Sequence, residues 1–165
     1  MDSVKVVSNS SPLINLSKID RLDLLEKLYG KVFIPNAVFE ELILKADYPR
    51  DIEKITSLIQ DKVIEVKIVK DINFVRALRK DLDSGESEVI ALAKEESADL
   101  VIIDEVDARR IAEFHDLNKT GFIGILIKAK KNGFVGDVIH LIDIAVEKGF
   151  WINKDLYQQI SNSLR

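Results

Sequence analysis

Glu86 and Asp104 are the residues whose types and placement in this sequence best suit metal chemistry. Glu86 begins a helical pattern and lies three and four positions before Val89 and Ile90, so we expect its carboxylate on the stripe that faces the core. Asp104 directly follows Leu100–Ile103, an apolar run typical of a buried strand. Open α/β sheets place their sites at the carboxyl ends of strands, and an inward carboxylate needs compensation. The pair therefore suggests a divalent-cation site.

Each of these acids also has a purely structural interpretation. An acid in the first turn of a helix, as predicted for Glu86, is stabilised by the helix dipole by ~0.3–1 kcal/mol. Asp104 could cap the helix that follows it, with Asp107 at the third position of a capping box. However, Asp107 shares a helical stripe with Ile111 and Phe114, which predicts that it also points inward.

Length and composition indicate an ordinary globular chain. The 165 residues fit one domain over 1–165. A pI near 5.3 and a net charge of −4 argue against a broadly basic nucleic-acid binder. These values do not exclude a nuclease, because acidic metal ligands themselves lower the pI. The absence of cysteine excludes disulfides, thiol nucleophiles and iron–sulfur clusters. We expect a cytoplasmic protein, because no signal-peptide layout or membrane-spanning run is seen.

Short apolar strands alternate with helical patterns along the chain. Strands are predicted at 4–7, 32–34, 63–66 and 100–103, and a short segment lies near 118–120. A helix is expected to start with Pro35 in its first position and to end before Tyr48. This alternation predicts parallel βαβ units in a three-layer α/β/α sandwich, with a central parallel sheet of about five strands.

Four segments, taken in order, resemble the motifs of the PIN domain, the fold of many prokaryotic toxin ribonucleases of the VapC type. They are VVSNSSPLI at 6–14, IPNAVFEEL at 34–42, GESEVIALA at 85–93 and LVIIDEVD at 100–107. The resemblance rests on their order, spacing and placement at strand ends, and it covers nearly the whole chain. The tail from Gly133 to Ile152 resembles that of a PIN-like subfamily of mostly uncharacterised prokaryotic proteins.

The resemblance implies a metal site made of Glu41, Glu86 and Asp104, with Asp107 beside them. The first acid of the family falls on position 9, where this sequence has Asn9. An asparagine oxygen can bind a hard cation or accept a hydrogen bond, but it brings no charge and cannot act as a base. Asn9 also suits a turn or a helix cap, so both interpretations stay open.

Other polar residues near the motifs allow two interpretations. Periodicity does not separate Glu41 from Glu40, and only the family pattern selects Glu41. The Ser10 and Ser11 hydroxyls suit a helix cap, and the Ser11 hydroxyl could also touch a phosphate or a water on the metal. Arg109 and Arg110 could contact an RNA backbone, although exposed basic residues are common.

The leading hypothesis is an endoribonuclease that depends on Mg²⁺ or Mn²⁺, hard ions that prefer oxygen ligands and bridge to phosphates. The resemblance implies an RNA substrate, a role as the toxin of a toxin–antitoxin pair, a cognate antitoxin protein as partner, and a homodimer. A receiver-like phosphoacceptor domain is disfavoured, because Ser8-Asn9 and Val66-Lys67 stand where its acids should be.

The alternative hypothesis is a PIN-like protein without catalytic activity. Asn9 removes one carboxylate, which should weaken metal binding. Such a protein could still bind RNA or an antitoxin in its groove, and its metal site would then be a degraded one.

Overall fold

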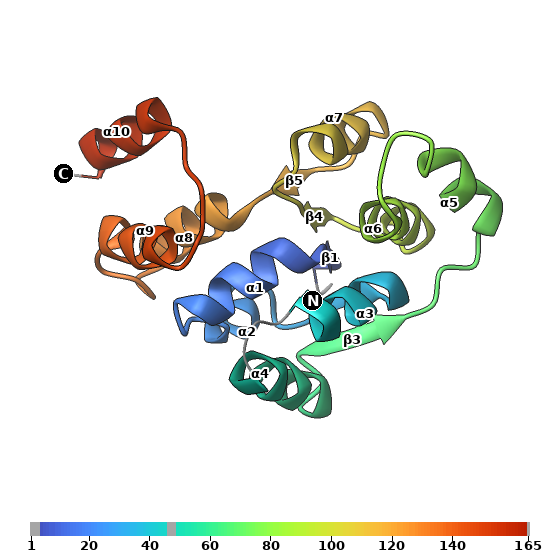
Figure 1. Ribbon diagram of the computed structural model, residues 1–165, viewed down its shortest axis with the longest axis horizontal. Helices are drawn as coiled ribbons and strands as arrows, with labels where there is room; N and C mark the ends of the chain where they lie inside the picture. Colours follow the sequence, from blue (N-terminus) through green and yellow to red (C-terminus); the bar gives the residue numbers. More distant parts are fainter. Residues whose placement is uncertain (1–3, 46–48, 165) are drawn as a thin grey trace.

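The computed structural model describes residues 4–45 and 49–164 (Figure 1). Within them, one parallel five-stranded sheet has the order β3-β2-β1-β4-β5. Its strands are β1 Val6–Ser8, β2 Val32–Pro35, β3 Ile64–Lys67, β4 Leu100–Ile102 and β5 Lys119–Thr120. The predicted parallel sheet is confirmed, and the short segment near 118–120 proves to be its edge strand.

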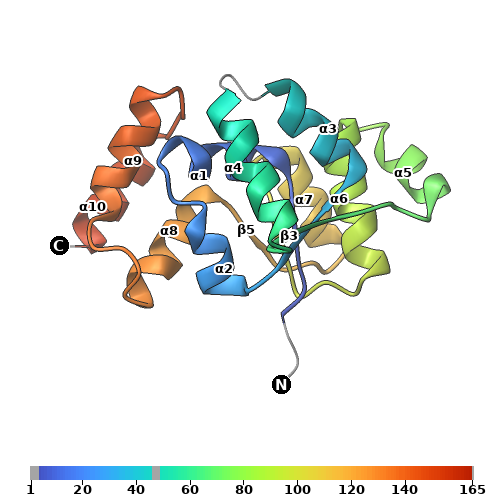
Figure 2. The same cartoon turned by 90° about the horizontal axis from the view of Figure 1, so that it is seen from below.

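Helices cover both faces of the sheet and give the predicted three layers. In Figure 1, α1, α2, α4 and α8 lie on one side of the sheet, and α5, α6 and α7 lie on the other, while α3 contacts both α1 and α6. Figure 2 shows α8, α9 and α10 together at one end of the molecule. The helices are α1 Ser10–Lys18, α2 Asp23–Tyr29, α3 Asn36–Lys45, α4 Pro49–Gln60, α5 Ile72–Leu78, α6 Ser84–Glu95, α7 Val106–Phe114, α8 Phe122–Lys131, α9 Val138–Glu147 and α10 Lys154–Ser163.

The central strands are apolar on both faces because helices cover both. Val6 and Val7 of β1 and Val101 and Ile102 of β4 have no exposed surface. This explains why the strands appear in the sequence as continuous apolar runs rather than alternating ones. Among the described helices, none is long and apolar enough to cross a membrane.

The direction in which the chain adds strands to the sheet reverses between β1 and β4. The chain moves from β1 to β2 and β3 on one side, then returns to β4 and β5 on the other. Ser8 pairs with Ile102, and the next residue, Asn9, donates its backbone N–H to the Ile102 carbonyl oxygen at 2.9 Å. Open α/β sheets bind ligands at such a switch point, beyond the carboxyl ends of the strands.

Pro35 departs from its predicted place. It is the last residue of β2, paired with Lys67, and α3 begins at Asn36. Pairing with β3 extends the strand by one residue, a tertiary contact that the local pattern does not contain. The predicted end of that helix, before Tyr48, lies outside the described residues.

Candidate metal centre

Two buried side-chain oxygens without partners mark the switch point. Asn9 is 3% exposed, and its Oδ1 accepts no hydrogen bond. Asp104 lies two residues after the end of β4, and its Oδ2 likewise accepts no hydrogen bond. In the described part of the chain, the Ser87 hydroxyl is the one other such atom. Burying a polar atom without a partner costs about 1–3 kcal/mol, so binding of a cation or another partner to these oxygens would be favourable.

Glu105 joins this centre, although its role was not predicted. The Asn9 amide donates from Nδ2 to Glu105 Oε2 at 3.0 Å, and the Ser11 hydroxyl donates to Oε1 at 2.8 Å. Glu105 occupies the N-cap position of α7 without capping that helix through its side chain. In the sequence, the signal for this role of Glu105 is its position directly after Asp104, at the end of a predicted strand.

Glu41 reaches the centre from α3. The Ser10 hydroxyl donates to Glu41 Oε2 at 2.7 Å. Gly85 of α6 makes room for this carboxylate, because a Cβ atom at Gly85 would lie 2.5 Å from Glu41 Oε1. Glu40 instead is exposed and accepts a hydrogen bond from Asn36 at 3.1 Å. The structure therefore places Glu41 rather than Glu40 beside the first turn of α1.

Glu86 lies at the rim of the centre rather than on the buried stripe that was predicted. Its backbone N–H donates to Asp83 Oδ1 at 2.8 Å, and Asp83 donates its backbone N–H to Glu86 Oε2 at 3.4 Å. This capping box turns the half-buried carboxylate back toward Asp83. Burial, then the charge of Asp83, and also that of Glu105 raise the pKa of Glu86 to about 7.

Asp104 accepts a hydrogen bond from the start of α8 and does not cap α7, the helix that follows it in the chain. Its Oδ1 accepts the backbone N–H of Phe122 at 3.0 Å, while α7 starts at Val106. Burial raises the pKa of Asp104, and the neighbouring Glu105 charge adds to the effect. The Phe122 N–H and the Arg109 charge act in the opposite direction. Burial therefore makes the charged form of Asp104 costly, and a positive charge beside it would offset this cost.

Asp107 does not point inward, so that prediction is wrong. Its side chain is 68% exposed and pairs with Arg110 at 3.4 Å. The buried face of α7 consists of Ala108 and Ala112, and Phe114 is 82% exposed. Two small residues form the packed face because they let the helix approach its neighbours closely, and a stripe counted from large apolar residues misses this.

The other polar predictions are met only in part. Ser10 and Ser11 donate to carboxylates instead of capping α1. Asn9 occupies the N-cap position of α1, but its side chain makes no cap hydrogen bond. Arg109 lies near Asp104 and donates to the Ile103 carbonyl oxygen at 3.2 Å. The contacts with RNA stay predictions.

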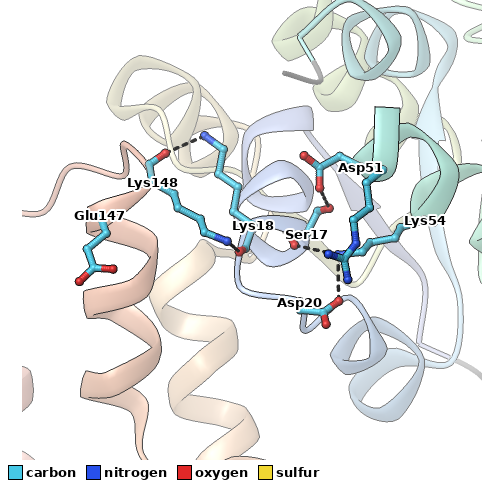
Figure 3. Close-up of a pocket in the computed structure, with 8 residues that line it drawn as sticks. Ser17, Lys18, Asp20, Asp51, Lys54, Glu147 and Lys148 are labelled. Atoms are coloured by element: carbon cyan, nitrogen blue, oxygen red, sulfur yellow. Dashed lines mark hydrogen bonds and ion pairs between the residues drawn. The ribbon is translucent and has the colours of Figure 1, made fainter. Parts of the chain in front are cut away.

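A separate cavity of about 820 Å³ lies at the other end of α1, between α4 and α9 (Figure 3). Lys18 and Lys148 each donate to the other's backbone carbonyl oxygen, at 3.1 and 2.8 Å. Lys54 pairs with Asp20 at 2.9 Å. Ser17, the first residue of α1 that lines this cavity, lies eight positions after Asn9, about 12 Å of helical rise, so the cavity is distinct from the switch point.

The residues at the switch point fit a hard divalent cation through two features. The donors are all oxygens, and two of the buried ones lack a partner. However, within residues 4–45 and 49–164, no three acidic, histidine or cysteine side chains are arranged to hold a metal ion. The fit therefore depends on an amide oxygen, Asn9 Oδ1, together with Asp104 and Glu105.

A comparison with protein families identifies the family to which this chain belongs. A family model described as a PIN domain matches residues 5–165, and the chain belongs to this family. The family has a nuclease-type fold and generally depends on divalent metal ions. No curated protein matches the chain.

The contact between Gly85 and Glu41 leads to a first prediction. In G85A, the new methyl group would displace the Glu41 carboxylate and break its hydrogen bond with Ser10. The melting temperature should change little, because the end of a flexible side chain can move. Calorimetry should show about tenfold weaker Mn²⁺ binding. G136A is the matched control, since no atom lies within 4 Å of a Cβ atom at Gly136. Unchanged Mn²⁺ affinity in G85A would exclude Glu41 from the centre.

The raised pKa of Glu86 leads to a second prediction. The pKa rises from 4.5 to about 7 on folding, so the folded state keeps a proton that the unfolded state has released. The native protein should therefore lose stability as the pH rises from 4.5 to about 7. E86Q cannot ionise, so at pH 8 it should melt above the native protein, while at pH 4 the two should agree. Differential scanning calorimetry measures this difference, with E53Q on the exposed side of α4 as control. An equal difference at both pH values would contradict the assignment.

Proposed function

We propose that this chain is a divalent-metal-dependent endoribonuclease. The observation that supports this most directly is the pair of buried, unpartnered oxygens, Asn9 Oδ1 and Asp104 Oδ2, at the switch point of a PIN-domain sheet. Asn9, Asp104 and Glu105 would hold the ion. Glu41 and Glu86 would complete the acidic surroundings, either as ligands or by accepting hydrogen bonds from water. Asp107, at the exposed side of α7, stays a predicted ligand that lies apart from the others.

The residues of the centre have distinct parts in the proposed hydrolysis. When bound, Mg²⁺ or Mn²⁺ would supply the Lewis acidity that activates water and offsets charge on the phosphate. Glu86, with a pKa of about 7, can exchange a proton near neutral pH. Ser10 keeps Glu41 in place, and Arg109 sets a positive charge beside Asp104. An RNA phosphate would thus meet local positive charge on a chain whose net charge is −4.

The biological setting is proposed from the resemblance to VapC-type toxins. On this basis the chain is the toxin component of a toxin–antitoxin pair and a single PIN domain over 1–165. It acts on RNA in the cytoplasm, pairs with a second copy of itself, and is inhibited by a cognate antitoxin protein. Exposed Arg110 and half-buried Ser11 are the proposed phosphate contacts, with Arg109 behind them.

A second candidate function is a PIN-like protein that binds RNA or an antitoxin without cleaving RNA. One observation favours it, namely that no three acidic, histidine or cysteine side chains of the described residues are arranged around a metal position. On this view, Asn9 marks a site that has lost a ligand.

Substitution of Asp104 tests the nuclease proposal. With Mn²⁺ present, the native protein should cleave RNA, and D104N should reduce both Mn²⁺ affinity and cleavage by about 10–100-fold or more, because it removes a buried ligand charge. D116N is the matched control, because Asp116 is exposed and its φ of 59° suits asparagine equally well. Cleavage of labelled RNA on gels and calorimetry provide the measurements.

The same experiment separates the two candidate functions. RNA binding without cleavage at any Mn²⁺ concentration would reject the nuclease and support the non-catalytic binder. Equal cleavage by D104N and the native protein would show that the activity arises elsewhere.

A further inference from the structure

Asn9 and Glu105 meet at the centre although they are far apart in the sequence. The Asn9 amide donates to Glu105 Oε2 at 3.0 Å, and the Ser11 hydroxyl donates to Oε1 at 2.8 Å. Asn9 is the N-cap residue of α1, Ser11 lies in the first turn of that helix, and the acceptor Glu105 is the N-cap residue of α7. Two residues at the start of α1 therefore hold one carboxylate that follows the neighbouring strand β4.

This contact gives a physical reason for an amide at position 9. A carboxylate there would face Glu105 at hydrogen-bond distance, and two like charges so close cannot both ionise. The amide instead gives a donor to Glu105. It also keeps Oδ1, which is buried and has no partner, available as a neutral ligand.

Glu105 retains the capacity to bind a cation while it accepts these hydrogen bonds. An ionised carboxylate has about four lone-pair sites, and the two hydrogen bonds use half of them. Its charge also acts on Asp104 and Glu86, since it contributes to the raised pKa values of both. Glu105 is therefore within electrostatic reach of two predicted ligands.

We infer that Asn9 and Glu105 work as one unit at the metal centre. Glu105 supplies the negative charge that position 9 lacks, and Asn9 holds Glu105 in place while offering its own Oδ1. The centre is then a rearranged one rather than a degraded one. This inference rests on the proposed metal dependence, and it names the residue that compensates for Asn9.

An exchange of the two side-chain types tests the unit. N9D/E105Q swaps carboxylate and amide and keeps the total charge, whereas N9D and E105Q alone change it. Without metal, N9D should lower the melting temperature by several degrees when Glu105 is present, through repulsion between two carboxylates. In the E105Q background, N9D should have little effect, because amide and carboxylate again pair.

Calorimetry with Mn²⁺ forms the second arm of the test. E105Q should weaken Mn²⁺ binding by about 10–100-fold, N9D alone should not strengthen it, and N9D/E105Q should recover most of the loss. E53Q, an exposed glutamate of α4, controls for the change in net charge and should bind Mn²⁺ like the native protein.

The outcomes that overturn the inference are distinct from failure of the proposed function. A gain in Mn²⁺ affinity from N9D alone would mean a degraded site, and unchanged affinity in E105Q would remove Glu105 from the centre. Equal effects of N9D on melting in both backgrounds would show that positions 9 and 105 act independently. If the native protein binds no Mn²⁺, the metal proposals fail together, and the melting temperatures still decide whether the two residues are coupled.

Discussion

The candidate centre depends on the parallel pairing of β1 with β4. This pairing sets Ser8 beside Ile102 and continues through the hydrogen bond from the Asn9 backbone to the Ile102 carbonyl oxygen. It brings the turn after β1 against the residues after β4, although more than ninety positions separate Asn9 from Glu105. Because β1 and β4 are buried by helices on both faces, a change in their register would move the apolar side chains out of the core.

Electrostatics forms the second constraint on the centre. Burial raises the pKa values of both Asp104 and Glu86, and the charge of Glu105 adds to both shifts. Three donors at the start of α1, namely the Asn9 amide and the Ser10 and Ser11 hydroxyls, stabilise two neighbouring carboxylates, Glu105 and Glu41. The remaining unpartnered oxygens, Asn9 Oδ1 and Asp104 Oδ2, are the atoms that the proposed cation would compensate.

Several features could be predicted because they depend on local pattern. The alternation of apolar strands and helices gave the three-layer sandwich, and Asp104 was correctly placed at the end of β4. Predictions failed where packing overrides periodicity. Asp107 is exposed because α7 packs through Ala108 and Ala112, and Pro35 ends β2 because β3 pairs with it. The capping expected of Ser10 and Ser11 failed because carboxylates from distant elements accept their hydroxyl protons.

The sequence by itself determined the order of the elements, the strand ends that carry polar residues, and the replacement of an expected acid by Asn9. These follow from hydrophobic spacing and from motif order, which are properties of neighbouring residues. Only the tertiary structure decided which carboxylate lies against Asn9. Glu105 takes that place because β1 and β4 are adjacent and because Asn9 and Ser11 donate to it. Contacts across so many residues arise from sheet pairing, which no local pattern contains.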